Sequence, residues 1–189
     1  MKFISTLLQD AYLVELEKKE DSRGFFARAF CENEFSDAGL EYKFIQKNIS
    51  ESKERNTLRG MHYQIGKDAE VKYIRCHKGA IKDVIVDIRK DSSTFMSYEA
   101  FELNEENYTA LYVPKGFAHG FITLTENVVV SYLVSSSYSS ENERAFRWND
   151  NAFNIRWPTS SPNLSERDSS HKDFDIDKHA LNSDLIEIG

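Results

Sequence analysis

The sequence predicts an all-β protein, an antiparallel sandwich or barrel with a few short helices. Short segments rich in β-branched and aromatic residues recur about every ten residues, with turn-forming residues between them. One of these segments alternates apolar and polar residues with the period of two that is typical of a strand. Aromatic residues make up 13% of the chain and suit either a core or a sugar-stacking surface.

The strand candidates follow one another along the chain. In residues 71–89, Val84, Val86 and Ile88 share one face of a strand, and Gly79 divides the segment into two strands. Further strands are expected at residues 57–64, 98–103, 110–113, 120–124 and 128–134.

The rest of the chain predicts one domain with little helix. A short helix is expected at residues 32–38, where Gly39 ends it. Because the sequence has no internal repeat and no Gly/Ser-rich linker, we expect a single domain over residues 1–189. After Pro158 the sequence becomes polar and irregular, and residues from about 173 onward are expected to form a loosely packed acidic tail.

The composition argues against several classes of protein. Asp and Glu outnumber Lys and Arg by 31 to 24, whereas a nucleic-acid partner requires a basic surface. An anionic substrate must therefore meet a locally basic pocket. No apolar run is long enough to span a membrane, and the N-terminal run is too weak for a signal peptide. Cys31 and Cys76 form neither a ligand pair nor a disulfide framework, which favours the cytoplasm.

The segment TLRGMHYQ, residues 57–64, is the first that can carry chemistry. As a strand it places Arg59 and Met61 on one face and Gly60 and His62 on the other. We expect Gly60 to remove bulk beside His62, so that a ligand can approach the backbone there. A lone histidine in a strand is more often a hydrogen-bonded structural residue, and the segment alone does not exclude that alternative.

The segment VPKGFAHGF, residues 113–121, is the second. Pro114 and Gly116 form a turn, and His119 follows at the start of a strand. The spacing P-x-G-x-x-H resembles the second motif of cupins, in which a turn delivers a histidine into the mouth of a small barrel. The alternative is a hairpin with a surface histidine.

The histidine pattern predicts no metal and no cofactor. A metal-binding cupin has two histidines separated by one residue, and here Gln64 stands where the second is expected. Zinc and iron sites usually take at least three histidine or carboxylate ligands, and only His62 and His119 are well placed, because His77 lacks the context. A barrel that keeps isolated histidines without a ligand cluster favours proton chemistry.

Three further residues have two possible roles each. Asp168, in LSERD, can orient an imidazole or be an exposed loop carboxylate. Tyr132, in VVVSYLV, can be a core ring, although a buried hydroxyl would need a partner. Lys72 follows Val71 in an apolar strand, where a lysine usually points to solvent.

Taken together, these segments resemble the RmlC family, the dTDP-4-dehydrorhamnose 3,5-epimerases. The resemblance covers about nine-tenths of the chain, in order, from DSRGFF through QKNIS, TLRGMHYQ, VKYIRCHKGAIKDVIVDIRKDS and VPKGFAHGF to RWND, IRWP and LSERD. It implies a cupin jelly-roll barrel and a homodimer with exchanged strands. It also implies epimerisation at C3 and C5 of a nucleotide-diphosphate sugar that carries a 4-keto group, without a metal.

The resemblance also implies roles for individual residues. His62 matches the base, Asp168 its orienting carboxylate, Tyr132 the acid that acts from the opposite face, and Lys72 a cation near the keto oxygen. The positions that match substrate contacts are Arg23, Phe26, Arg28, Gln46, Asn48, Arg59, His119, Tyr138 and Arg167.

The chain departs from the family at two of these positions. Arg28 replaces a usual glutamate and is expected to change substrate choice rather than chemistry, unless it is a solvated surface residue. Arg167 replaces a lysine and keeps the charge. The nucleotide base, the sugar and the number of inverted carbons stay open. Alternatives are a single-carbon epimerase, a ketoisomerase, a non-catalytic sugar-binding cupin and a metal oxygenase; the retained catalytic set and the missing ligand cluster favour the epimerase.

Overall fold

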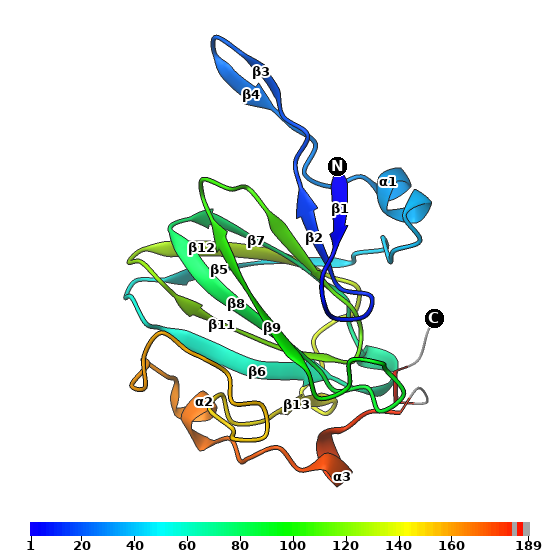
Figure 1. Ribbon diagram of the computed structural model, residues 1–189, viewed down its shortest axis with the longest axis vertical. Helices are drawn as coiled ribbons and strands as arrows, with labels where there is room; N and C mark the ends of the chain where they lie inside the picture. Colours follow the sequence, from blue (N-terminus) through cyan, green and yellow to red (C-terminus); the bar gives the residue numbers. More distant parts are fainter. Residues whose placement is uncertain (183–184, 187–189) are drawn as a thin grey trace.

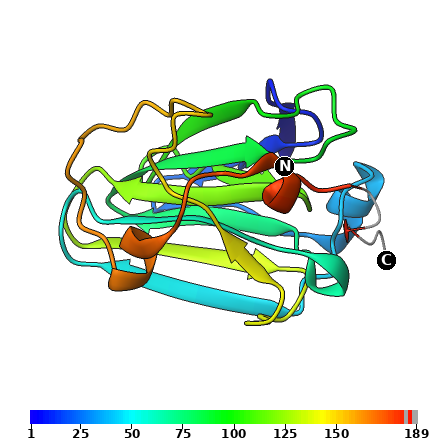
Figure 2. The ribbon, with the colours of Figure 1, turned by 90° about the horizontal axis from the view of Figure 1, so that it is seen from below.

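Two antiparallel sheets face each other in the computed structural model, which describes residues 1–182 and 185–186. One sheet has six strands in the order β1-β2-β10-β7-β12-β5, and the other has five in the order β13-β6-β11-β8-β9 (Figures 1 and 2). The predicted all-β architecture with a few short helices is confirmed. None of the helices in the described part has the length and apolar character that a membrane crossing requires.

The element bounds set the frame for the site. The six-stranded sheet contains β1 Lys2–Ser5, β2 Tyr12–Glu15, β5 Gln46–Ser52, β7 Lys72–Lys78, β10 Ala110–Val113 and β12 Val128–Val134. The five-stranded sheet contains β6 Leu58–Gln64, β8 Ala80–Asp87, β9 Tyr98–Asn104, β11 Phe117–Thr123 and β13 Glu143–Ala145. The remaining elements are the hairpin strands β3 Lys19–Asp21 and β4 Gly24–Phe26, the helices α1 Glu32–Asp37, α2 Glu166–Ser170 and α3 Ile176–His179, and a 3-10 turn at Gly66–Asp68.

The strands expected from residue 57 onward are present, and Gly79 separates β7 from β8 as predicted. A Cβ at Gly79, whose φ is +72°, would lie 2.4 Å from Oγ1 of Thr125, so this tight turn requires glycine. The helix expected at residues 32–38 is α1, and Gly39 follows it with φ +70°. Strands β1 and β2 were not expected.

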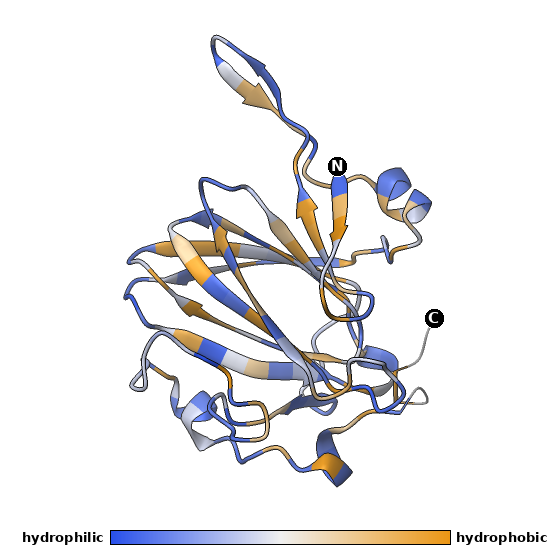
Figure 3. Cartoon of the chain, viewed as in Figure 1, coloured by the Kyte–Doolittle hydropathy of each residue, from blue (hydrophilic) through white to orange (hydrophobic). Residues whose placement is uncertain are grey.

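Apolar residues fill the space between the sheets and cover the outer side of both; on the six-stranded sheet, Phe35 of α1 packs against Tyr73 and Tyr112. One cluster lies between the sheets and includes Ile74 and Leu111 from one sheet and Ile85 and Phe121 from the other. A second cluster covers the outer side of the five-stranded sheet. In Figure 3 the strands carry most of the apolar colour, whereas α1 is largely hydrophilic. The packed outer layer is what places the C-terminal segment against the barrel.

The expectation of a loosely packed tail from about residue 173 is wrong for the described residues. Phe174 and Leu181 belong to the outer cluster, and Leu181 is 1% exposed. The backbone N–H of Leu181 donates to Ile88 over 2.7 Å, and its carbonyl accepts from Lys90 over 2.8 Å. A few widely spaced apolar residues pack this acidic segment against the sheet. The average polarity of the segment does not reveal them.

A bulge in β6 overturns the predicted alternation around His62. His62 pairs with His119 and Arg59 with Phe121, so two residues of β6 stand opposite the single residue Gly120. The extra residue brings Arg59 and His62 to the same side of the sheet, although strict alternation places them on opposite faces. Both side chains therefore line one hollow of the barrel.

The contacts of Gly60 explain the bulge. They do not support the expected role of Gly60, which was to let a ligand approach the backbone. A Cβ on Gly60 would lie 2.5 Å from Cα of Gly120, and the φ of Gly60 is +142°. The backbones of β6 and β11 thus approach more closely than any side chain allows. Glycine at this position sets the distance between the strands that carry His62 and His119.

We predict that Gly60→Ala destabilises the fold by roughly 1–3 kcal/mol more than Gly39→Ala, the usual cost of overpacking. Both glycines have positive φ, but a Cβ at Gly39 meets no atom within 4 Å, so Gly39→Ala measures the backbone cost alone. Denaturant unfolding of both variants tests this. Equal losses of unfolding free energy would contradict the proposed close contact.

Candidate active site

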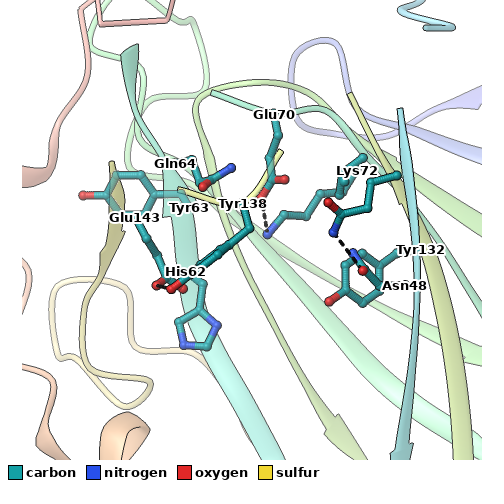
Figure 4. A pocket seen from close by; sticks show the side chains of 11 residues that line it. Asn48, His62, Tyr63, Gln64, Glu70, Lys72, Tyr132, Tyr138 and Glu143 are labelled. Carbon is teal, nitrogen blue, oxygen red and sulfur yellow. Dashed lines mark hydrogen bonds and ion pairs between the residues drawn. The ribbon is translucent and has the colours of Figure 1, made fainter. Parts of the chain in front are cut away.

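The candidate active site is a pocket between the two sheets at one end of the barrel (Figure 4). It consists of two adjoining hollows of about 260 and 220 Å³. Both are lined by His62, Lys72 and Tyr132, three of the four predicted catalytic residues. The fourth, Asp168, lines the second hollow.

His62 and Asp168 form a hydrogen-bonded pair. The Nε2 atom of His62 lies 2.7 Å from Oδ1 of Asp168, although the residues are 106 positions apart in the chain. The Asp168 side chain is buried, whereas the imidazole is partly open to the pocket. Because Nε2 faces the carboxylate, the lone pair left for a ligand is on Nδ1. The arrangement suits a base that is held and charge-stabilised by a carboxylate.

The start of helix α2 fixes Asp168. Ser165 is the N-cap, and its Oγ accepts the backbone N–H of Asp168 over 3.0 Å while donating to Oδ2 over 2.9 Å. Burial alone would raise the pKa of the Asp168 carboxyl, but the hydrogen bond and charge of His62 outweigh burial and lower it. The carboxylate therefore keeps its charge in the pH range in which a histidine titrates. Its contribution to the stability of the fold is lost only as the pH falls through the depressed pKa.

Tyr132 and Lys72 stand on the opposite sheet from His62. Tyr132 comes from β12 and Lys72 from β7, and both side chains face the pocket. Lys72 is not directed into open solvent, as a strand lysine usually is: its side chain is 13% exposed, and its Nζ lies 3.2 Å from Oε1 of Glu70. A substrate held between the sheets thus meets the imidazole on one side and a phenol and an ammonium group on the other.

Strand β5 supplies the polar wall beside them. Asn48 pairs with Tyr132 in the sheet, and Gln46 pairs with Val134. The amide of Gln46 donates to Oδ1 of Asn48 over 2.9 Å (Figure 4). Both residues line the pocket as predicted, while Ile49 points outward and is 74% exposed. The strand is polar on its inward face, and its exposed face carries Lys47 and Glu51 as well as Ile49, so it lacks the alternation of an ordinary core strand.

Tyr138 and Arg167 meet at Glu143 on the margin of the pocket. The Tyr138 hydroxyl donates to Oε2 of Glu143 over 3.0 Å, and the guanidinium of Arg167 donates to the same oxygen. Burial alone would raise the pKa of Glu143, but these two donors outweigh burial and lower it. The cluster holds an ionised carboxylate and a guanidinium together at the entrance.

His119 and Arg59 line the second hollow beside His62. The Nε2 atom of His119 lies 2.8 Å from Oδ1 of Asp83, a carboxylate that is fully buried. Arg59 is exposed, and its guanidinium forms no ion pair with any carboxylate in residues 1–182 and 185–186. Arg59 is thus a free cation at the hollow, as an anionic ligand requires.

Gln64 has a structural role at the position where a metal-binding cupin would have its second histidine. Its amide donates to the carbonyls of Asp68 and Ser137 over 3.0 and 3.2 Å, and its carbonyl accepts from Ser139 over 2.7 Å. The side chain is 4% exposed. Three backbone partners occupy its polar atoms and tie the loops before β7 and after β12 to β6.

Arg23, Phe26 and Arg28 do not reach the pocket of their own chain. They lie on or beside the β3–β4 hairpin, which projects away from the barrel in Figure 1. Arg23 pairs with Asp21 over 2.6 Å, and Arg28 pairs with Glu34 over 2.6 Å. Phe26 is 71% exposed.

Several site residues were not predicted: Glu70, Asp83, Glu143 and His171. His171 follows α2, and its Nε2 lies 3.7 Å from Oδ1 of Asp168. The motif S-x-x-D within LSERD carries a detectable signal, because it predicts a capped helix that would orient Asp168. Glu70 and Glu143 carry no such signal, since only the tertiary fold brings them to the pocket.

These features define a class: a cupin-like β-barrel with an acid–base pocket between its sheets. Residues 5–175 match the sequence model of the family described as dTDP-4-dehydrorhamnose 3,5-epimerase. The chain belongs to that epimerase family, and the predicted family and enzyme class are confirmed.

Individual relatives agree over most of the chain. The dTDP-4-dehydrorhamnose 3,5-epimerase of Salmonella typhimurium is 41% identical over 172 residues, which are 90% of this chain and 93% of the relative. The crystal structure of the Bacillus anthracis enzyme with TDP and PPi bound is 41% identical, with a TM-score of 0.88 over 92% of this chain and 99% of that one. ChmJ, a 3'-monoepimerase from Streptomyces bikiniensis, is 32% identical, with a TM-score of 0.82 over 89% of this chain and 85% of that one.

We predict that Asp168→Asn leaves the fold intact and lowers kcat/KM by about 10²–10⁴-fold, because His62 loses its charged partner. Asp173→Asn serves as the control, since Asp173 is exposed and pairs with Arg147 away from the pocket. An Asp168→Asn enzyme with wild-type kcat/KM would show that the pair does not act in catalysis.

Proposed function

We propose that the chain inverts C3 and C5 of a nucleotide-linked 4-keto-6-deoxy sugar, converting dTDP-4-dehydro-6-deoxyglucose to dTDP-4-dehydrorhamnose. The observation that carries this proposal is the placement of the His62–Asp168 pair across the pocket from Tyr132 and Lys72. Membership of the epimerase family and the TDP in the Bacillus anthracis relative support the substrate class. The roles proposed below for individual residues rest on the family resemblance and on this placement.

The first step is removal of a proton from the carbon beside the ketone. Nδ1 of His62 takes this proton, and Asp168 stabilises the imidazolium that forms. The electron pair moves into an enolate whose negative charge lies on the keto oxygen. Lys72, paired with Glu70 at the pocket wall, supplies the cation that stabilises this oxygen.

The second step returns a proton to the opposite face of the same carbon. Tyr132 lies on the facing sheet and donates its phenolic proton there, which inverts the centre. His62 then releases its proton to solvent, and Tyr132 regains one from solvent. The same cycle at the second carbon completes the reaction, and each inverted carbon acquires one solvent hydrogen.

Cations near the pocket suit the pyrophosphate of the substrate. Arg59 has its guanidinium at the hollow, Arg167 stands at the entrance, and His119 lies between the sheets. Guanidinium groups match phosphate oxygens in a bidentate manner. No metal or cofactor takes part in the proposed steps, because the protein's own groups supply the base, the acid and the cation. The free thiols of Cys31 and Cys76 and the nucleotide-sugar substrate favour a cytoplasmic enzyme.

We further propose a homodimer of single-domain chains in which the β3–β4 hairpin of one chain completes the pocket of the other. Arg23 and Phe26 project from the barrel on this hairpin, although both match substrate contacts of the family. The side chains of Ile45 and Ile49 are 63% and 74% exposed, and they lie just before and within strand β5, which lines the pocket. This exposed apolar surface suits coverage by a second chain. Arg28 would then reach the ligand of the partner chain, with an effect on substrate choice.

We predict that Tyr132→Phe separates the two steps. Proton removal by His62 continues, so deuterium from solvent still enters beside the keto group, but the epimerised product forms more slowly because the opposite-face acid is missing. His62→Ala, as the matched variant, abolishes exchange as well as epimerisation. Proton NMR in deuterated water measures both. Unchanged rate and stereochemistry in Tyr132→Phe would make that ring a packing residue.

The same measurement distinguishes the remaining alternative. The similarity to ChmJ shows that a 3'-monoepimerase shares this architecture. An enzyme that inverts both carbons gives a product with two inverted centres, each carrying deuterium from solvent. A single-carbon epimerase gives a product with one inverted centre.

We predict that the hairpin acts in the partner chain. A mixed dimer of one His62→Ala chain and one Arg23→Ala chain contains one pocket with both residues intact if the hairpin crosses over. Such a dimer regains up to about half the wild-type activity, whereas each variant alone is impaired. Co-expression with two affinity tags isolates the mixed dimer. Absence of recovery, with the mixed dimer verified, would place the hairpin outside the partner's pocket.

A further inference from the structure

We propose that His62, Asp168 and His171 form an inhibitory binding site for a zinc ion. One ligand atom from each residue lies within 4.8 Å of the others. Oδ1 of Asp168 is 2.7 Å from Nε2 of His62 and 3.7 Å from Nε2 of His171, so two imidazoles converge on the same carboxylate oxygen. This group differs from the cupin metal position, because the Gln64 amide is occupied by backbone and His119 faces Asp83.

The distances fit a tetrahedral ion. Zinc binds imidazole nitrogen and carboxylate oxygen at about 2.0–2.2 Å, which places neighbouring ligand atoms about 3.3–3.5 Å apart. The 2.7 and 3.7 Å separations from Oδ1 of Asp168 lie on either side of that value, and all three ligand atoms lie within 4.8 Å of one another, so one ion could be held after the side chains readjust. Two histidines and one carboxylate are a frequent ligand set for zinc, with the fourth position left to water.

The Nε2 atom of His171 is a buried polar atom without a hydrogen-bond partner within the described residues. An unpaired buried polar group costs free energy, and a bound cation would remove that cost. Asp168 lies in the first turn of α2 and His171 directly follows the helix, three positions later, so both side chains lie beside His62.

Zinc at this site would inactivate the base by changing its tautomer. Because the ionised carboxylate of Asp168 can only accept, the resting pair is inferred to have the hydrogen on Nε2 of His62, 2.7 Å from Oδ1, and the lone pair on Nδ1. A zinc ion bound to Nε2 requires that lone pair, so the ring hydrogen moves to Nδ1 with no net gain or loss of protons. Nδ1 then has no lone pair with which to take a proton from the sugar. This inhibition rests on the proposed role of His62, whereas zinc binding itself does not.

Binding is tested without substrate. Purified full-length protein, freed of metal with a chelator, is titrated with zinc in competition with a fluorescent zinc indicator. We expect one site per chain that His171→Ala weakens by about 100-fold or more, since loss of an outer-shell partner alone costs roughly 10–100-fold. His77→Ala is the control, because His77 is exposed and bonded to Ser131. Equal zinc affinity in wild type and His171→Ala would overturn the site.

Inhibition is tested on the same samples. The metal-free enzyme should be fully active, zinc should abolish deuterium exchange at the concentration that fills the site, and chelator should restore it, while magnesium has no effect. Zinc that fills the site without slowing exchange would overturn the inhibitory role. Exchange that persists in metal-free His62→Ala would instead refute His62 as the base, so failure of the proposed function is seen separately from failure of the zinc site.

Discussion

The hydrogen bond between His62 and Asp168 is the interaction on which the site depends. It joins strand β6 to a helix that begins more than a hundred residues later. The C-terminal segment reaches β6 because apolar residues such as Phe153 and Leu181 anchor it over the outer side of the five-stranded sheet. Ser165 then fixes the direction of the carboxylate. The packing of the outer layer is therefore part of the catalytic arrangement.

The second constraint is that the two sheets face each other across the pocket. Inversion of a carbon beside a ketone requires a base on one face of the ring and an acid on the other. A barrel supplies this separation directly, since His62 belongs to one sheet and Tyr132 and Lys72 to the other. The bulge at Gly60 adds Arg59 to the same hollow as His62. The groups proposed for binding and for proton transfer thus stand on the same two sheets.

The sequence predicts the strands after residue 57 well because their apolar periodicity is strong. Strand β5 was missed because its inward face is polar and its single apolar residue, Ile49, points outward, so the segment lacks the apolar alternation that marks a core strand. The side of Arg59 was predicted wrongly, because a bulge shifts the alternation without changing the composition. The family resemblance supplied His62 and Asp168 as a pair. Neither Glu143 nor His171 was predicted, because their roles arise only from tertiary contacts.

Because its carboxylate can only accept a hydrogen bond, Asp168 is inferred to hold His62 with the hydrogen on Nε2 and the lone pair on Nδ1. Nitrogen-15 NMR of the metal-free enzyme, labelled at histidine and assigned with a His62→Gln variant, reports which ring nitrogen carries the hydrogen when the imidazole is neutral. We expect a protonated Nε2 and an unprotonated Nδ1 for His62. A hydrogen on Nδ1 of the neutral ring would contradict this inference, because the nitrogen assigned to take the substrate proton would already be occupied.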